Sequence, residues 1–160
     1  MRKFILLIFG IIICLFLSQT ISLACSCTAP PKNKTEKQLI ELEQKRSKAI
    51  FAGEVVEIVV PKTPSGELEQ FAEVRFKVQR MWKGLKTEEV KVSTANVCCI
   101  CGYEFKVGES YLVYANGNEN LSTDTCTRTK RLSDAGNDLK VLGKGKTLKN
   151  KTSLQKMGEI

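Results

Sequence analysis

The chain has 160 residues, of which 42% are hydrophobic and 26% charged, and its formal net charge at pH 7 is +8. This length is enough for one domain of ordinary size and excludes two domains with independent hydrophobic cores. The chain contains no histidine, which excludes catalytic triads and metal centres that depend on an imidazole. We therefore expect a single-domain protein that is not an enzyme.

Residues 1–24 have the layout of a secretory signal peptide. Arg2 and Lys3 precede an apolar run at 4–17, and polar residues follow it. The run is shorter than the roughly 20 apolar residues that a helix needs to cross a bilayer. We therefore expect cleavage instead of a retained membrane anchor, and a protein that is secreted.

The expected cut follows Ala24. Ser22 and Ala24 place small residues at the third and first positions before the cut, which is the pattern of ordinary secretion. A lipoprotein signal also ends at a cysteine, and lipidation would anchor the protein at Cys25. Such a signal normally has leucine where this chain has Ser22, so we favour a free N-terminus at Cys25. Cleavage lowers the formal charge from +8 to +6, because the leader carries two basic residues and no acidic one.

After the cut, a proline-rich segment at 28–34 is expected to be extended. Thr35 is a good N-cap for a helix of strong helix formers that runs to Lys48. From residue 49 to 60 the residues are β-branched or aromatic, which predicts a strand, and Gly53 indicates a bulge or bend within it.

Further strands are expected at 72–78, 90–94 and 111–115, with a last extended piece at 121–127. Apolar and polar residues alternate along 72–78, as in a half-buried strand. A short helix capped around Ser133 is expected to end at Gly143. These elements predict a mainly β fold: a small closed β-barrel with one or two flanking helices at 25–143.

Residues 144–160 are rich in lysine and weakly apolar, which predicts a mobile basic tail. Such a tail suits contact with an anionic envelope polymer or membrane surface. Barrels of this kind also bind single-stranded nucleic acid. We do not expect that partner here, because the tail holds much of the basic excess and the chain is exported.

The mature chain would keep six cysteines: Cys25, Cys27, Cys98, Cys99, Cys101 and Cys126. An even number in an exported chain indicates a disulfide framework, and the sequence alone leaves its pairing open. The C-x-x-C spacing at 98–101 also fits a redox motif or an all-cysteine zinc site, but no βαβ pattern surrounds it. Cys98 and Cys99 are expected to be free, bridged to each other, or in exchange with Cys101.

The segment 101–115 resembles a stretch of the tissue inhibitors of metalloproteinases, in which a Cys-Gly pair is followed by a Val-Gly turn and a Tyr-Leu strand ending in Ala. The similarity extends to Cys25-Ser26-Cys27, to Phe51-Ala52-Gly53 and to Cys126, so it covers about residues 25–143. It implies a disulfide-bridged OB-fold barrel of the netrin-like superfamily.

The chain departs from this family at other cysteines. No cysteine lies between Cys27 and Cys98 for the family's third N-terminal bridge, and Cys98 and Cys99 are extra. The cysteine-rich second domain of the vertebrate inhibitors is also missing. The chain is therefore most similar to single-domain, bacterial-type members.

The resemblance implies that Cys25 pairs with Cys101 and Cys27 with Cys126. Bridges that close loops of about 75 to 100 residues are each worth on the order of 4 kcal/mol in the chain-entropy model. By the same resemblance, the amine and carbonyl oxygen of Cys25 would chelate the catalytic zinc of a partner metalloproteinase. Ser26 would enter the adjoining pocket, and Cys27, Thr28 and Ala29 would complete the inhibitory wedge, beside a ridge formed by Cys99 and Ile100.

This function needs no cofactor of its own, since the zinc belongs to an extracellular zinc metalloproteinase, and we expect a monomer. A free α-amine has a pKa of about 7.7 to 8.0, so part of it is neutral near pH 7 and able to bind a metal. The alternative is an extracellular netrin-like binding module for an envelope polymer or a protein ligand, in which Cys25 and Cys27 are only staples.

Overall fold

A computed structural model of the protein describes residues 25–97, 100–117 and 120–147. Its elements are α2 (Glu36–Arg46), β1 (Ala49–Val59), β2 (Phe71–Lys83), β3 (Glu89–Ala95), β4 (Ser110–Ala115), β5 (Lys130–Arg131), the 3-10 helix η1 (Leu132–Asp134) and α3 (Gly136–Leu142). This confirms the mainly β fold. The expected leader, Cys98, Cys99 and residues 148–160 of the expected tail lie outside the described residues. No helix in the described part of the chain has the length and apolar character needed to span a membrane.

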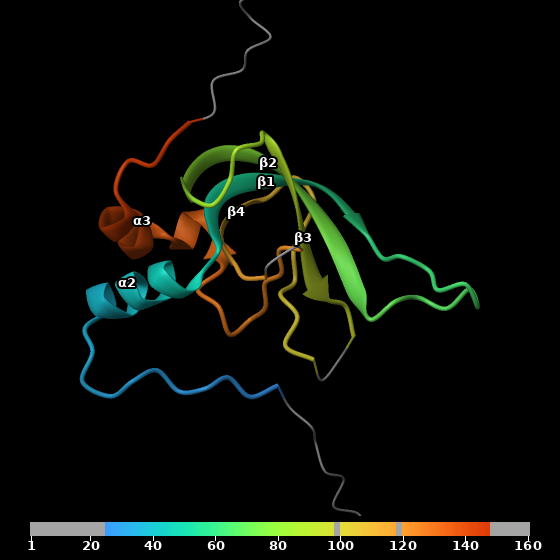
Figure 1. Ribbon diagram of the computed structural model, residues 1–160, viewed down its shortest axis with the longest axis horizontal. Coiled ribbons are helices and arrows are strands. Elements are labelled where there is room, and N and C mark those ends of the chain that lie inside the picture. Colours follow the sequence, from blue (N-terminus) through green and yellow to red (C-terminus); the bar gives the residue numbers. More distant parts are fainter. Residues whose placement is uncertain (1–24, 98–99, 118–119, 148–160) are drawn as a thin grey trace, which may run out of the picture.

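The five strands form one antiparallel sheet in the order β3-β2-β1-β4-β5. The sheet is strongly curved, and α2 and α3 lie together on one side of it (Figure 1). The Ser93 amide donates to Leu121 O at 2.8 Å, and the Thr123 amide donates to Ser93 O at 3.0 Å. These bonds connect the edge strand β3 to the segment that follows β4. Full closure into a barrel stays a prediction.

The central strand β1 has a fully buried first half and pairs with β2 on one side and β4 on the other. Its pairing with β2 shifts register between Ala52 and Gly53. A Cβ atom at Gly53 would lie 2.9 Å from Lys77 O, so the close approach of the two strands favours glycine there. The irregularity expected at Gly53 is therefore confirmed.

Alternate residues of β1 contribute to two hydrophobic clusters. Phe51 belongs to the main core, where its ring meets the edge of Phe76, and Phe105 packs edge-on against both Phe76 and Tyr111. The next residue back, Ile50, belongs to a second cluster with Leu112, Tyr114 and Ala135, against which Trp82 and Leu139 pack. The second cluster therefore joins the sheet to α3.

Helix α2 begins where the sequence predicts. Thr35 and Gln38 form a capping box, in which the Thr35 hydroxyl accepts from the Gln38 amide at 3.3 Å and the Gln38 side chain accepts from the Thr35 amide at 2.9 Å. Ile40 is fully buried. The helix ends at Arg46, two residues before the predicted end, because Ser47 adopts an extended backbone and β1 follows at once.

Helix α3 carries a buried carboxylate that connects several elements. Asp138 accepts hydrogen bonds from the Tyr114 hydroxyl at 2.9 Å, from Arg128 Nε at 2.9 Å and from Lys130 Nζ at 2.8 Å. Arg128 also pairs with Glu36 of α2. Burial alone would raise the pKa of Asp138, but the hydrogen bonds from Arg128, Lys130 and Tyr114 outweigh it and hold that pKa below its usual value. Burial, together with the charge of Asp138, raises the pKa of Tyr114.

Two expectations about the last third of the domain are wrong. The extended piece expected at 121–127 forms only isolated bridges at Ser122 followed by a turn, because local side-chain hydrogen bonds satisfy the backbone there. Ser133 does not cap α3: its hydroxyl bonds to Asp134, and the helix begins at Gly136 without a side-chain cap.

The expected tail is attached to the domain at its start. Lys146 and Met81 exchange two backbone hydrogen bonds, of 2.7 and 2.8 Å. The indole nitrogen of Trp82 donates to Gly143 O at 2.9 Å. The ordered unit therefore extends past residue 143, to at least Lys146.

Candidate functional site

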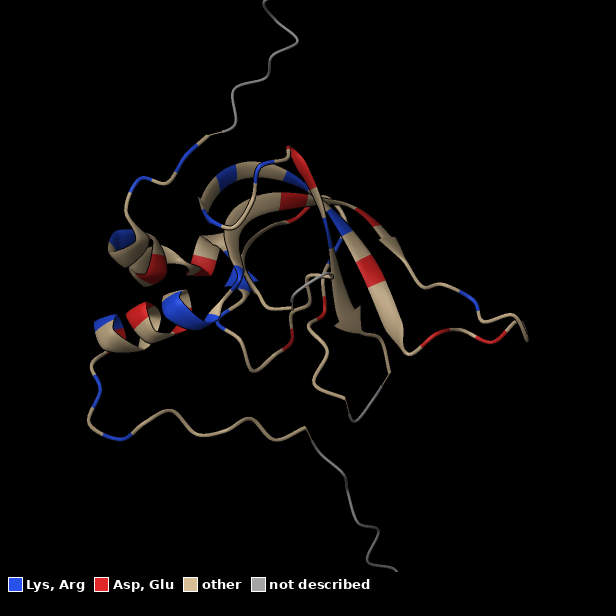
Figure 2. Cartoon of the chain, in the orientation of Figure 1, with Lys and Arg blue, Asp and Glu red and all other residues tan. Residues whose placement is uncertain are grey.

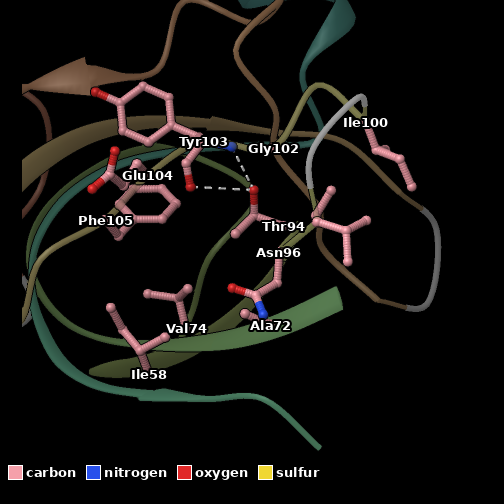
Figure 3. A pocket seen from close by; sticks show the side chains of 12 residues that line it. Ile58, Ala72, Val74, Thr94, Asn96, Ile100, Gly102, Tyr103, Glu104 and Phe105 are labelled. Atoms are coloured by element: carbon pink, nitrogen blue, oxygen red, sulfur yellow. Dashed lines mark hydrogen bonds between the residues drawn. The ribbon is translucent and has the colours of Figure 1, made fainter. Parts of the chain in front are cut away.

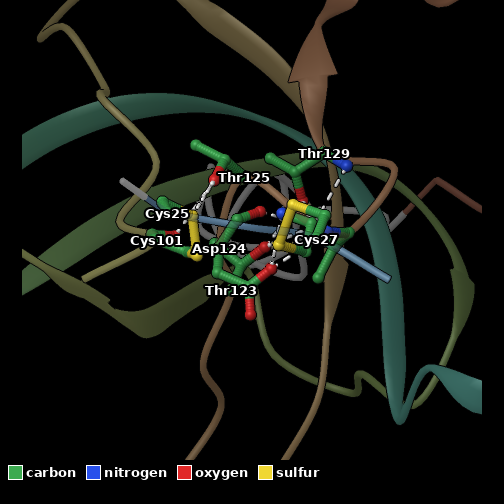
Figure 4. The surroundings of a disulfide bond; sticks show 9 residues. Cys25, Cys27, Cys101, Thr123, Asp124, Thr125 and Thr129 are labelled. Carbon is green, nitrogen blue, oxygen red and sulfur yellow. Dashed lines mark hydrogen bonds between the residues drawn. A yellow bond between two sulfur atoms is a disulfide. The ribbon is translucent and has the colours of Figure 1, made fainter. Parts of the chain in front are cut away.

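The expected wedge lies on the surface and outside any helix or strand. Residues 25–30, which include Cys25, Ser26, Cys27, Thr28 and Ala29, are all exposed. Cys25 is bridged to Cys101 and Cys27 to Cys126, each with a Cα–Cα distance of 5.2 Å (Figure 4). This is the pairing that the resemblance implies. Both bridges span long stretches, with sequence separations of 76 and 99 residues.

Cys101 is held in place by the two residues that follow it, which contact the end of β3. A Cβ atom on Gly102 would lie only 1.9 Å from Ala95 O, so the chain after Cys101 can approach β3 this closely only with glycine. The Tyr103 amide donates to the Thr94 hydroxyl at 2.8 Å. Tyr103 then packs against the aromatic core at Phe105. The anchor for Cys25 is therefore held by the core of the sheet.

Cys126 lies in a turn built by threonine and aspartate side chains. One carboxylate oxygen of Asp124 accepts from the amides of Cys126 and Thr127, at 2.8 and 3.0 Å. The Thr123 hydroxyl donates to Tyr114 O at 3.0 Å and lies 2.7 Å from the Thr129 hydroxyl. Through these buried hydroxyls the turn is attached to β4.

The two anchor loops are also joined to each other. The Thr125 amide donates to Cys101 O at 2.9 Å, and the Thr125 hydroxyl donates to the same oxygen at 3.3 Å. The Thr125 hydroxyl also lies 3.7 Å from the sulfur of Cys25. The sulfur atoms of all four bridged cysteines lie within 4.8 Å of one another. The wedge is therefore attached at one compact cluster instead of two separate points.

No charge lies in the segment that carries the wedge. Residues 25–31 contain no acidic or basic side chain, and the first lysines follow at Lys32 and Lys34, farther along the chain toward α2 (Figure 2). The strands, in contrast, carry ion pairs such as Arg75 with Glu57 at 3.0 Å and Lys91 with Glu73 at 2.8 Å. The side chains of the exposed wedge are thus uncharged, on a highly charged domain.

Apolar surface adjoins the cysteine cluster. Ile100, expected in the neighbouring ridge, is 42% exposed, and it lines a pocket of about 160 Å³ together with Cys101 and Phe71, which is 49% exposed. Cys99, the other expected ridge residue, lies outside the described residues. A second pocket of about 250 Å³ lies between the sheet and residues 102–105, with Ile100 at its edge (Figure 3).

The structure therefore brings together most of the residues expected at the site. Cys25, Cys27, Cys101 and Cys126 meet, and Ile100 lies beside them. Sequence reasoning missed the turn that positions Cys126, formed by Thr123, Asp124, Thr125, Thr127 and Thr129. Its only signal was the density of threonine around Asp124, which favours local turns over strands.

Comparison with family models and with curated proteins gives no match. The family membership that the residues suggest therefore stays a prediction. In the described part of the chain, the sulfur atoms of these four cysteines are the one group of three or more cysteine or acidic ligand atoms that lie close enough together to share a metal ion, and both pairs are bonded as disulfides.

Proposed function

We propose that the exported chain, cut before Cys25, inhibits an extracellular zinc metalloproteinase. The observation that carries this proposal is the attachment of an exposed, uncharged N-terminal segment at Cys25 and Cys27 to two anchor loops. A short, fixed segment without charged side chains suits insertion into the active-site cleft of another protein. We also propose that the curved sheet is a closed netrin-like OB barrel; the bonds between Ser93 and residues 121–123 support this.

The chemistry would depend on the first residue. A neutral α-amine and the carbonyl oxygen of Cys25 form a five-membered chelate with a metal ion. Catalytic zinc keeps one position open for water or substrate, and this chelate would take that position. The Cys25–Cys101 bridge fixes the residue before binding, so little conformational freedom is lost when the complex forms.

The remaining contact would be apolar and would surround the chelate. Ser26 is the side chain next to the chelating residue and would enter the partner's pocket. Ile100 and Phe71 expose apolar surface beside Cys101, and burial of such surface is the usual source of affinity between proteins. This surface favours a protein partner over a charged envelope polymer, which would require a basic groove.

The direct test is to extend the mature chain by one alanine before Cys25. The extension removes the free amine from Cys25 and leaves both bridges in place, so we expect loss of inhibition with unchanged thermal unfolding. A matched control carries one alanine after Ile160 and should inhibit as well as the unmodified chain. Inhibition that survives the N-terminal extension would refute the chelate.

The state of the N-terminus must be measured first. N-terminal sequencing and intact mass of the exported protein should give residues 25–160 less the hydrogens lost in the bridges. An added diacylglycerol, or an uncleaved leader, would contradict the proposal, because either one leaves no free amine on Cys25.

A further inference from the structure

The four bridged cysteines lie in one cluster, so the two disulfides are neighbours in space. Their sulfur atoms all lie within 4.8 Å of one another. Cys25 and Cys27 come from the exposed segment, and Cys101 and Cys126 come from two loops that Thr125 joins. We propose that, when both bridges are reduced, these four thiolates bind one Zn²⁺ ion.

The geometry needs only a small change. A tetrahedral site with Zn–S bonds of about 2.3 Å places its sulfur atoms about 3.8 Å apart. Each bonded pair must move apart to reach this spacing, whereas sulfurs of different pairs are already within 4.8 Å. Cys25 and Cys27 lie in a segment outside any helix or strand, so that segment can shift while Cys101 and Cys126 stay on their loops.

The ligand set is chemically suited to zinc. Four thiolates in tetrahedral arrangement form a closed structural zinc site. The chain has no histidine that would compete for the ion. Three of the four cysteines are exposed and the other, Cys101, is half-buried, so the ion can reach them from solvent.

The surroundings also favour thiolates. The Thr125 hydroxyl is 3.7 Å from the sulfur of Cys25 and donates to Cys101 O at 3.3 Å. Once the sulfur is ionised, this hydroxyl can turn its hydrogen from that oxygen to the thiolate, as outer-shell groups commonly do for metal ligands. The nearby carboxylate of Asp124 accepts from two backbone amides, those of Cys126 and Thr127. These bonds offset part of its negative charge.

The change from two disulfides to a four-thiolate zinc site balances when a dithiol is the reductant. Two dithiol molecules reduce the two disulfides, become cyclic disulfides themselves, and leave four thiols. Zinc binding then releases four protons and gives a site of net charge −2. In the reverse direction, two molecules of a small disulfide such as oxidised glutathione take up four electrons from the thiolates and four protons from solvent and become four thiols, both bridges re-form, and Zn²⁺ is released. The same sulfurs therefore hold either two bridges or one metal ion, whatever the function of the N-terminal amine.

The test uses the chain with Cys14, Cys98 and Cys99 all replaced by serine, so that only the four clustered cysteines remain. The protein is reduced without oxygen and titrated with Co²⁺ as a spectroscopic probe, then with Zn²⁺. We expect one ion per chain, with the thiolate-to-cobalt charge-transfer bands and the d–d bands of a tetrahedral all-sulfur site, and displacement of Co²⁺ by Zn²⁺. Oxidised glutathione should release the ion and restore both bridges.

Single replacements decide whether all four sulfurs take part. Cys25→Ser, Cys27→Ser, Cys101→Ser and Cys126→Ser should each weaken Zn²⁺ binding by more than about tenfold and change the cobalt spectrum. Unchanged binding in any one of them would overturn the proposal, as would the absence of a tetrahedral sulfur signature in the parent. If the reduced parent is unfolded without metal, one equivalent of Zn²⁺ should restore its near-UV circular dichroism. Failure to restore it would also overturn the proposal.

Discussion

Replacing Asp138 by asparagine should destabilise the domain although Asp138 lies outside the candidate site. The side chain is 1% exposed and accepts from Tyr114, Arg128 and Lys130 at 2.8 to 3.2 Å. Asparagine keeps the shape, but it presents an amide group to the donors and removes the carboxylate that pairs with Arg128 and Lys130. Breaking a buried ion pair costs about 3 to 5 kcal/mol.

The loss of stability expected for Asp138→Asn is smaller than the range of about 3 to 5 kcal/mol would suggest, about 2 to 3 kcal/mol. The side chains of Arg128 and Lys130 are 19% and 28% exposed, so water partly solvates them, and Arg128 keeps its pair with Glu36. We therefore expect the free energy of unfolding to fall by about 2 to 3 kcal/mol. The free energy of unfolding can be measured by urea titration at pH 7, with the fluorescence of Trp82 as the probe.

The matched control is Asp134→Asn, because Asp134 is exposed and its carboxylate accepts a hydrogen bond only from its neighbour Ser133 among the described residues. It should change the free energy of unfolding by less than about 0.5 kcal/mol. A loss of the same small size in Asp138→Asn would refute the reasoning, because it would mean that the buried network contributes nothing net.

The pH dependence gives a second readout of the same variant. The pKa of Asp138 is lower in the folded protein than its usual value. The ionised carboxylate therefore contributes fully to the free energy of unfolding above the unfolded-state pKa of about 3.9, and this contribution is lost as the pH falls through the folded-state pKa. The difference in stability between wild type and Asp138→Asn should therefore shrink in acid. If the stability difference between the two proteins stayed constant from pH 7 into the acid range, the lowered folded-state pKa of Asp138 would be contradicted.

Two further predictions concern the anchors of the wedge. Gly102→Ala should displace the loop that carries Cys101 and lower the melting temperature, because the new Cβ would lie 1.9 Å from a backbone oxygen. Gly136→Ala should be neutral or stabilising, because its new Cβ would have no described heavy atom within 4 Å apart from its chain neighbours and its own helix backbone. Replacing Cys27 and Cys126 together by serine should lower the free energy of unfolding by up to about 4 to 5 kcal/mol, since the bridge has a sequence separation of 99 residues, and should weaken inhibition. Equal melting temperatures for the two glycine variants would contradict the first prediction, and an unchanged urea midpoint the second.

The fold was largely predictable where the signal is local. The alternation at 72–78, the cap at Thr35 and the irregularity at Gly53 each follow from a few neighbouring residues. The turn around Asp124 was not predicted, because its side-chain hydrogen bonds compete with a strand pattern of similar strength. The burial of Asp138 and the pairing of Lys146 with Met81 depend on partners far away in the sequence, which no local pattern reveals.

The candidate site was predictable only in part, and for a different reason. Cysteine spacing alone leaves the pairing of Cys25, Cys27, Cys101 and Cys126 open. Similarity to a family supplied the pairing that the structure contains. In the sequence, exposed apolar residues such as Phe71 look the same as the buried apolar residues of the same strand. Alternation assigns residues to the two faces of a strand, but it does not show whether other parts of the chain pack over the ends of that strand.

The long spans of the two bridges have a consequence for biogenesis. In the proposed export of the chain, Cys25 and Cys27 would leave the translocation channel long before Cys101 and Cys126, which follow 76 and 99 residues later. An oxidant that acts in this interval would join the two early thiols to each other. Yield from an expression host should therefore depend on a disulfide isomerase that reopens such premature links more than on oxidising strength.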